Sequence, residues 1–332
     1  MTLLDVVDLT VTFPTPDGPV TPVSGLTFSV GAGESLGVVG ESGSGKSVTS
    51  MAIMGLLPKK AVVSGSITFD GIDLLAAREK DLCGIRGARI AMIFQDALTS
   101  LNPVYTVGYQ IAEMIQTHHA DVDKAELRNR TLELIDAVGI PNPSTRIDQY
   151  PHEFSGGMRQ RAMIAMAIAN EPDLLIADEP TTALDVTVQA QVMEVLERIQ
   201  ERTSSSLLLI THDLGVVAGV ADRIMVMYAG RDVEQGTVDE IFYDPRHPYT
   251  RGLLGSLPRI DRREAGAALN RIRGNPPSLL HLPPGCPFWP RCPYAERGRC
   301  DQERPAMVEV APGRLVACVR VDELPSWEEE RG

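Results

Sequence analysis

Aromatic residues are scarce in this sequence and make up 5% of its 332 residues. Proteins that bind single-stranded nucleic acid stack bases on aromatic side chains, so this scarcity argues against that class. An excess of positive charge is also missing, because the formal net charge is −13. Binding to a phosphate backbone or to an anionic lipid surface needs the opposite sign. We therefore expect no nucleic-acid partner and no direct electrostatic contact with a membrane.

Long apolar runs are absent as well. No run approaches the roughly 20 residues that a membrane span requires. The N-terminus reads MTLLDVVD and lacks the basic region of a signal peptide. Hydrophobic residues nevertheless make up 43% of the chain, which is enough for a sizeable core. The composition predicts a soluble, cytosolic protein that reaches a membrane only through a partner.

A glycine-rich loop follows a short apolar strand near the N-terminus. The strand is expected over 35–40 (SLGVVG), and the loop GESGSGKS spans 40–47. This loop fits the pattern G-x4-G-K-[ST], in which glycines let backbone N–H groups surround phosphates. Lys46 is expected at the β and γ phosphates of a nucleotide, and Ser47 at Mg²⁺. The rest of the predicted cradle consists of Gly40, Ser42, Gly43, Ser44 and Gly45.

An acidic pair ends a second apolar strand, LLIADE at 174–179. In α/β sheets, ligands bind at the carboxyl ends of the strands. Asp178 is expected to hold Mg²⁺, directly or through water, and Glu179 to orient and polarise an attacking water. A similar strand, LLLI, is expected at 207–210. Helices and strands alternate around these runs, so the predicted fold class is α/β with central parallel strands.

Residue patterns also predict several elements around this core. N-terminal strands are expected over 3–13 and 26–30, with a turn-rich loop over 14–22 between them. Helices are expected over 107–140 and 158–170.

The octapeptide FSGGMRQR, at 154–161, lies between the two nucleotide motifs. A Ser-Gly-Gly turn at the start of a helix offers N–H donors, a hydroxyl and the positive end of the helix dipole. Ser155, Gly156 and Gly157 are therefore predicted to form a second anion site. The motif resembles the Leu-Ser-Gly-Gly-Gln signature of ATP-binding cassette (ABC) ATPases, and the order of the motifs is similar. It departs from that signature at Phe154 and Met158.

The resemblance implies an ABC-type ATPase with a RecA-like parallel sheet, N-terminal antiparallel strands and a helical subdomain at about 96–170. It implies that two ATPase units enclose ATP, each completing the other's site with its signature. By matching motif, Gln95 resembles the glutamine that senses Mg²⁺ and water, and His212 resembles the histidine at the γ-phosphate. Asp185 matches a loop that crosses the dimer interface. Phe13 matches the aromatic residue that stacks on adenine, although a core position would also explain it.

Prolines become frequent and periodicity fades after about residue 245. The predicted domains are an ATPase domain over 1–245, a C-terminal domain over 246–325 and a disordered tail over 326–332. YPHEFSGGMRQR at 150–161 and HPYTRGLL at 247–254 are similar to segments of dipeptide and oligopeptide importer ATPases of the "D" subunit type. Nickel importers share this architecture.

The resemblance implies a subunit that hydrolyses ATP with Mg²⁺ to power peptide import, at the cytoplasmic face of a bacterial inner membrane. The implied partners are a second, "F"-type ATPase, two transmembrane permeases and an extracytoplasmic peptide-binding protein. The residues reveal no cargo pocket, so import of nickel or another small solute remains an alternative. A soluble ABC ATPase acting on ribosomes or DNA is a distant alternative, because the chain has no second cassette and no basic patch.

Four of the five cysteines fall in the proline-rich part of the chain. Disulfides do not suit a reducing cytosol, whereas a metal would stabilise a segment too small to build a large core. Zinc sites usually contain a C-x2-4-C knuckle, which is absent, and irregular spacing suits a 4Fe–4S cluster. Zinc, no metal, or a metal- or redox-sensing role remain alternatives. The predicted ligands are Cys286, Cys292, Cys300 and Cys318.

Overall fold

The computed structural model describes residues 1–95, 100–182, 184–257 and 272–327. The chain forms two compact units. The first comprises Met1–Leu4, Val30–Ser35 and Thr68–Ile210, and the second comprises Asp5–Ser29, Leu36–Ile67 and Thr211–Gly332. The domain boundaries predicted from the sequence stay predictions. Most of the predicted tail, residues 328–332, lies outside the described residues.

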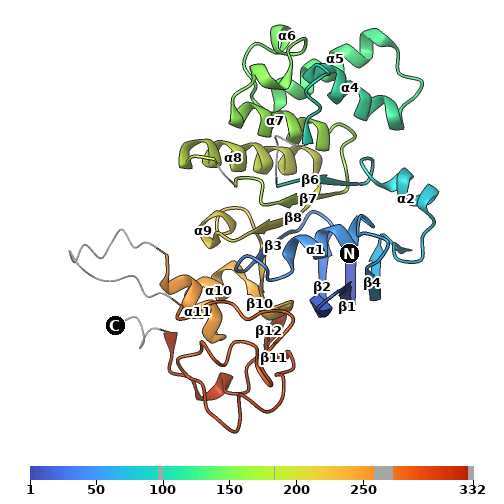
Figure 1. The fold of residues 1–332 in the computed structure, drawn as a ribbon. Helices are drawn as coiled ribbons and strands as arrows, with labels where there is room; N and C mark the ends of the chain where they lie inside the picture. The colour runs from blue at the N-terminus through green and yellow to red at the C-terminus, as the bar shows by residue number, and fades with distance from the viewer. Residues whose placement is uncertain (96–99, 183, 258–271, 328–332) are drawn as a thin grey trace. The chain divides into compact units, whose positions relative to one another are not determined.

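Each element is named with the unit that holds most of its residues (Figure 1). The first unit contains β5 (Ile72–Asp73), α2 (Glu79–Ile85), β6 (Ile90–Ile93), α4 (Val107–His118), α5 (Lys124–Ala137), α6 (Pro143–Arg146), η1 (Pro151–Glu153), α7 (Gly156–Ala167), β7 (Leu174–Asp178), α8 (Val186–Thr203) and β8 (Ser206–Thr211). The second contains β1 (Thr2–Thr15), β2 (Gly18–Gly31), β3 (Ser35–Val39), α1 (Lys46–Ile53), β4 (Val62–Phe69), α9 (Leu214–Val217), β9 (Arg223–Tyr228), β10 (Arg231–Thr237), α10 (Val238–Tyr243), α11 (Pro248–Gly255), β11 (Val308–Ala311), β12 (Arg314–Val316) and η2 (Val321–Glu323).

Parallel strands β6, β7 and β8 form the sheet of the first unit, in that order. Ile176 of β7 lies beside Met92 of β6 on one side and Leu208 of β8 on the other. Every residue of these strands is buried. Burial of one such side chain contributes about 1.5–3 kcal/mol, so these apolar runs are stable only with both faces covered. The structure confirms the parallel strands predicted over 174–177 and 207–210.

The helices α4, α5, α6 and α7 lie together in the first unit and run from teal to green in Figure 1. The sequence predicts one helical stretch over 107–140, whereas the structure has two helices. α4 ends at His118, and α5 begins after Asp123, whose carboxylate accepts hydrogen bonds from two backbone N–H groups of α5. A cap of this kind stabilises a helix start by about 1 kcal/mol. Among the described residues, no helix combines the length and apolar character that a membrane span needs.

The N-terminal strands are longer than the sequence predicts. A loop is expected over 14–22, yet β1 continues to Thr15 and β2 begins at Gly18. β2 is an edge strand, in the order β2-β1-β4. A proline cannot donate a ladder hydrogen bond, and an edge strand leaves such positions unpaired. Pro19 and Pro22 are therefore compatible with β2, and only a tight turn joins the two strands.

The second unit contains a sheet in the order β3-β9-β10-β12-β11. β3 and β9 are parallel, and the remaining neighbours are antiparallel. β11 and β12 come from the C-terminal part of the chain, and Val316 of β12 lies beside Glu234 of β10. The C-terminal segment, residues 246–325, thus contributes two strands, β11 and β12, to the edge of the sheet that also contains β3. This connection places the segment in the same unit as the glycine-rich loop.

Candidate nucleotide site and cysteine pocket

The glycine-rich loop lies between β3, which is fully buried, and α1, which begins at Lys46. Gly45, at the end of the loop, has a φ of 102°. A side chain at this position would collide with the backbone carbonyl of Pro22. Only glycine combines this left-handed backbone with such a close approach. The local conformation therefore depends on a glycine that the nucleotide motif also requires.

The ammonium group of Lys46 points back into the loop. Its Nζ donates hydrogen bonds to the carbonyl oxygen of Gly40 at 2.7 Å and to that of Glu41 at 3.0 Å. The residue is only 4% exposed. A buried ammonium needs acceptors, because removing it from water is costly. A nucleotide phosphate would replace these neutral acceptors with stronger charge-assisted ones. Ser47 follows in the first turn of α1 and is half-buried.

Asp178 and Glu179 stand at the end of β7 in the first unit, where Asp178 is 3% exposed. Glu179 has a φ of 48°, which is uncommon for a residue other than glycine and clusters at functional sites. Its Oε2 accepts hydrogen bonds from Nε2 of Gln95 at 3.0 Å and from Oγ1 of Thr182 at 2.7 Å. The structure thus brings Gln95 and Glu179 together. Thr182 is a contact that no sequence motif indicated.

The Ser-Gly-Gly turn begins helix α7. Oγ of Ser155 caps the helix by accepting a hydrogen bond from the N–H of Met158 at 3.3 Å. Ser155 and Gly156 are exposed, so the helix N-terminus and its positive dipole end face solvent. A Cβ atom on Gly157 would lie 2.6 Å from Cγ1 of Val188 in α8. The packing of α7 on α8 therefore requires glycine at position 157.

The two departures from the ABC signature leave this turn intact. Phe154 is 3% exposed, and the guanidinium of Arg146 lies 6.0 Å from its ring centroid. Its side chain packs inside the first unit rather than facing the anion site. Met158 contributes its backbone N–H to the cap, and every residue except proline offers that group.

The other predicted site residues lie at element ends or on β1. Asp185 caps α8, accepting hydrogen bonds from the N–H groups of Thr187 at 3.1 Å and Val188 at 3.0 Å. His212 is exposed and directly follows β8. Phe13 lies near the end of β1 and is half-buried, outside the apolar core. Phe13, His212 and the glycine-rich loop belong to the second unit, and the remaining predicted nucleotide residues belong to the first.

Similarity to known proteins extends along nearly the whole chain. The ABC transporter family model matches residues 23–182, and the model for the C-terminal region of oligopeptide/dipeptide transporters matches residues 233–300. The oligopeptide transport ATP-binding protein OppD of Salmonella typhimurium is 53% identical over 97% of this chain and 95% of its own length. The chain belongs to the family of ABC-type oligopeptide and dipeptide transport ATP-binding proteins. DppD of Bacillus subtilis, a dipeptide transport ATP-binding protein, is 52% identical over 95% of this chain and 94% of its own length.

Solved structures agree with this assignment. The dimeric structure of MJ0796, a bacterial ABC transporter cassette, matches with a TM-score of 0.64 at 25% identity and covers 71% of this chain and 98% of its own. These comparisons confirm the ABC ATPase fold, with mixed α/β sheets and helices. They also confirm the ATP-binding and ATP-hydrolysing function that the motifs predicted.

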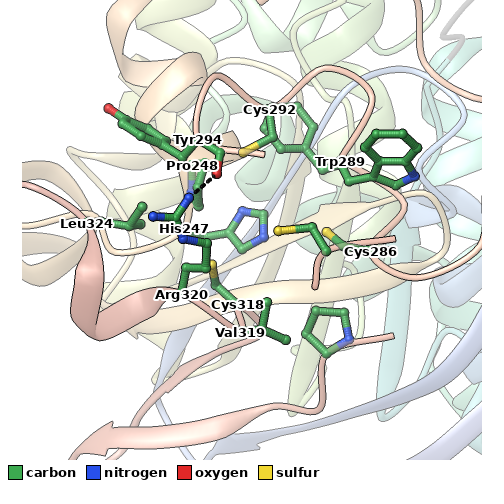
Figure 2. Close-up of a pocket in the computed structure, with 13 residues that line it drawn as sticks. His247, Pro248, Cys286, Trp289, Cys292, Tyr294, Cys318, Val319, Arg320 and Leu324 are labelled. Carbon is green, nitrogen blue, oxygen red and sulfur yellow. Dashed lines mark hydrogen bonds between the residues drawn. The ribbon is translucent and has the colours of Figure 1, made fainter. Parts of the chain in front are cut away.

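In this transport ATP-binding protein, the four clustered cysteines line one pocket of the second unit. Figure 2 shows the sulfur atoms of Cys286, Cys292 and Cys318 around the imidazole of His247, and Cys300 lines the same pocket. Burial raises the pKa of the Cys286 thiol to about 11 and that of Cys292 to about 12. Both thiols therefore keep their protons at physiological pH unless a bound metal displaces them. The cysteines that the sequence groups together also meet in space.

The four thiols share a pocket, but within the described part of the chain they are not arranged as a set of metal ligands. Across residues 1–95, 100–182, 184–257 and 272–327, no group of three or more His, Cys, Asp or Glu side chains is arranged to hold a metal ion. Four thiols on one pocket nevertheless match the donor set of an iron–sulfur cluster in their chemistry. The 4Fe–4S cluster and its zinc alternative stay predictions.

Proposed function

We propose that this chain is the ATPase subunit that powers import of dipeptides or oligopeptides across a bacterial inner membrane. The supporting observation is its near-full-length similarity to relatives named for oligopeptide and dipeptide transport. The match to the transporter C-terminal region at 233–300 supports the same conclusion. No observation favours nickel or another small solute as the cargo.

The glycine-rich loop holds the phosphates of ATP with its backbone N–H groups, and Lys46 neutralises the β and γ phosphates. By their motifs, Ser47 and Asp178 would hold Mg²⁺ and Gln95 would sense it, and the ion would neutralise charge on the phosphates. The support is the local geometry of two parts of the chain. In the glycine-rich loop, Lys46 already donates hydrogen bonds to carbonyl oxygens, and at the end of β7 the carboxylate of Asp178 is buried. Phe13 stacks on the adenine ring.

Glu179 polarises the water that attacks the γ-phosphate, and His212 contacts that phosphate. The hydrogen bonds from Gln95 and Thr182 to Oε2 hold the carboxylate of Glu179 in one orientation. A positioned general base typically accelerates a reaction by about 10² to 10⁴-fold. The left-handed backbone of Glu179 supports the role, because strain of this kind persists where the surrounding structure imposes it.

The complete site is shared between two chains. Ser155, Gly156 and Gly157 of one chain bind the γ-phosphate held by the loop of an "F"-type partner ATPase, and the partner does the same in return. Asp185 lies in the loop that crosses this interface. The exposed helix N-terminus at Ser155 and Gly156 supports the arrangement, because it offers an anion site that faces outward.

The assembly reaches the membrane through two permease subunits, and the chain itself binds peripherally at the cytoplasmic face. An extracytoplasmic peptide-binding protein selects the cargo. Residues 246–325 form an accessory C-terminal domain whose four cysteines hold a 4Fe–4S cluster. The support for the cluster is the convergence of four thiols on one pocket.

A pull-down of the chain from its native membranes in mild detergent, followed by mass spectrometry, tests the proposal. The expected co-purifying proteins are two multi-span permeases, a second ABC ATPase and a peptide-binding protein. Recovery of a nickel- or sugar-binding protein instead of the peptide-binding protein would support the transport mechanism but contradict a peptide cargo. Recovery with ribosomes, or without any membrane subunit, would overturn the transport role.

A further inference from the structure

Glu41 is the second residue of the glycine-rich loop, and the nucleotide motif assigns it no role. In the structure each of its polar groups has a partner. Its carboxylate forms an ion pair with Arg291, with Nη1 to Oε2 at 2.6 Å and Nη2 to Oε1 at 3.0 Å. Its backbone N–H donates to the hydroxyl of Tyr249 at 2.9 Å, and its carbonyl accepts from Nζ of Lys46. Two residues of the C-terminal segment therefore hold the loop.

The guanidinium of Arg291 is itself held in place. Its side chain is only 6% exposed. Besides Glu41, it donates to the carbonyl of Arg273 at 3.0 Å, to that of Gly274 at 3.3 Å and to the hydroxyl of Tyr228 at 3.2 Å. A planar guanidinium can serve these acceptors at once, whereas a lysine ammonium cannot match the two-point contact with a carboxylate.

Aromatic rings surround the contact and limit the access of water. The ring centroids of Tyr228, Tyr249 and Phe288 lie 4.6 to 5.3 Å apart. The guanidinium of Arg291 lies 5.8 Å from the centroid of Tyr228 and 6.0 Å from that of Phe288. An ion pair beside low-dielectric groups is stronger than one in water. The side chain of Arg291 is buried and that of Glu41 is 27% exposed. The ion pair is therefore partly shielded from water and contributes more than a fully exposed salt bridge, whose contribution would be small.

Tyr249 owes its position to the HPYTRGLL motif. His247 caps α11 by accepting a hydrogen bond from the N–H of Tyr249 at 3.1 Å, and Pro248 occupies the first turn of the helix. Tyr249 is fully buried, and burial raises the pKa of its hydroxyl, which stays neutral as it accepts from Glu41. The motif that resembles peptide importers thus places a side chain against the phosphate loop.

We propose that Arg291 is a positioning residue for ATP binding, acting on the phosphate loop through Glu41. A carboxylate inside a loop built for phosphates repels the ligand unless its charge is balanced. Arg291 supplies that balance and holds the start of the loop in one conformation, with Tyr249 fixing the backbone. The C-terminal segment is then part of the ATP-binding apparatus. The proposal depends on ATP binding by the loop and not on the identity of the cargo.

Titration of the purified full-length chain with a fluorescent ATP analogue tests the proposal. Arg291→Gln leaves the carboxylate of Glu41 without its partner, and we expect the Kd to rise about tenfold, which corresponds to the loss of about one charged hydrogen bond. Arg291→Lys restores the charge but not the two-point contact, so its Kd lies between those of wild type and Arg291→Gln. Adding Glu41→Gln to Arg291→Gln removes the unbalanced charge and recovers part of the affinity.

The matched control is Arg299→Gln, which removes an exposed ion pair with Glu323 in the same segment and leaves the Kd unchanged. In the assembled ATPase, Arg291→Gln raises the KM for ATP and changes kcat less than about twofold, because Arg291 does not touch the reacting atoms. An unchanged Kd in Arg291→Gln, or a double variant weaker than either single one, would overturn the proposal. If Arg291→Gln does not fold, Arg291→Lys becomes the test variant. A raised Kd in Arg291→Lys supports the proposal, and an unchanged Kd overturns it.

Discussion

Nε2 of Gln95 donates a hydrogen bond to Oε2 of Glu179 at 3.0 Å. The same oxygen accepts from Oγ1 of Thr182 at 2.7 Å. Two donors on one oxygen hold the carboxylate of Glu179 in place at the end of β7. The proposed general base and the proposed sensor of Mg²⁺ are thus coupled directly. A change at Gln95 during ATP binding would reach the carboxylate that is proposed to polarise the water.

Glu179→Gln keeps the size of the side chain and removes its negative charge. We expect ATP binding to remain and hydrolysis to fall by about 100-fold or more, because the proposed general base is lost. Single-turnover hydrolysis by the assembled ATPase measures the effect. Glu197→Gln on the exposed face of α8 is the control and leaves the rate unchanged. Hydrolysis near the wild-type rate in Glu179→Gln would show that another group acts as the base.

Lys46→Ala removes the ammonium proposed to meet the β and γ phosphates. One charged hydrogen bond contributes about 1.5–3 kcal/mol, so the Kd for ATP should rise by roughly 10 to 100-fold. Equilibrium titration of the purified chain measures the change. Lys80→Ala, at an exposed position in α2, is the matched control. Equal affinities in wild type and Lys46→Ala would remove this residue from the nucleotide site.

The core strands and the nucleotide motifs could be predicted from the sequence, because apolar runs and glycine motifs are each defined by a few consecutive residues. The ion pair between Glu41 and Arg291 joins positions 250 residues apart. No sequence pattern indicates a contact between residues so far apart in the chain. The edge position of β2, which accommodates Pro19 and Pro22, is likewise a property of the sheet. The positive φ of Glu179 also depends on packing around it rather than on its own preference.

Gly156→Asp places a carboxylate at the exposed start of α7. The nearest atom to a Cβ there is Cδ2 of Leu184 at 4.0 Å, so the fold should tolerate the change. Negative charge at the proposed anion site should abolish ATP hydrolysis by the assembled pair while the thermal unfolding midpoint stays within a few degrees. Gly219→Asp is the control, because a Cβ at that exposed position meets nothing within 4 Å. Normal activity of the Gly156→Asp complex would contradict the shared site.

Iron and acid-labile sulfide analysis after anaerobic purification tests the 4Fe–4S proposal. We expect about four irons per chain and a brown protein. Cys292→Ser should lose the colour and iron, because its thiol lines the pocket. Cys83→Ser should keep both, because Cys83 is exposed and lies outside the cluster. A colourless wild-type protein with one zinc per chain would contradict the 4Fe–4S proposal and support the zinc alternative.

The most direct test of the central claim is uptake of a labelled dipeptide or oligopeptide by native cells in which this chain is replaced by Glu179→Gln. If the chain powers peptide import, uptake falls to the level of cells lacking the chain, while Glu197→Gln cells import normally. Peptide uptake at the wild-type rate in Glu179→Gln cells would contradict the account.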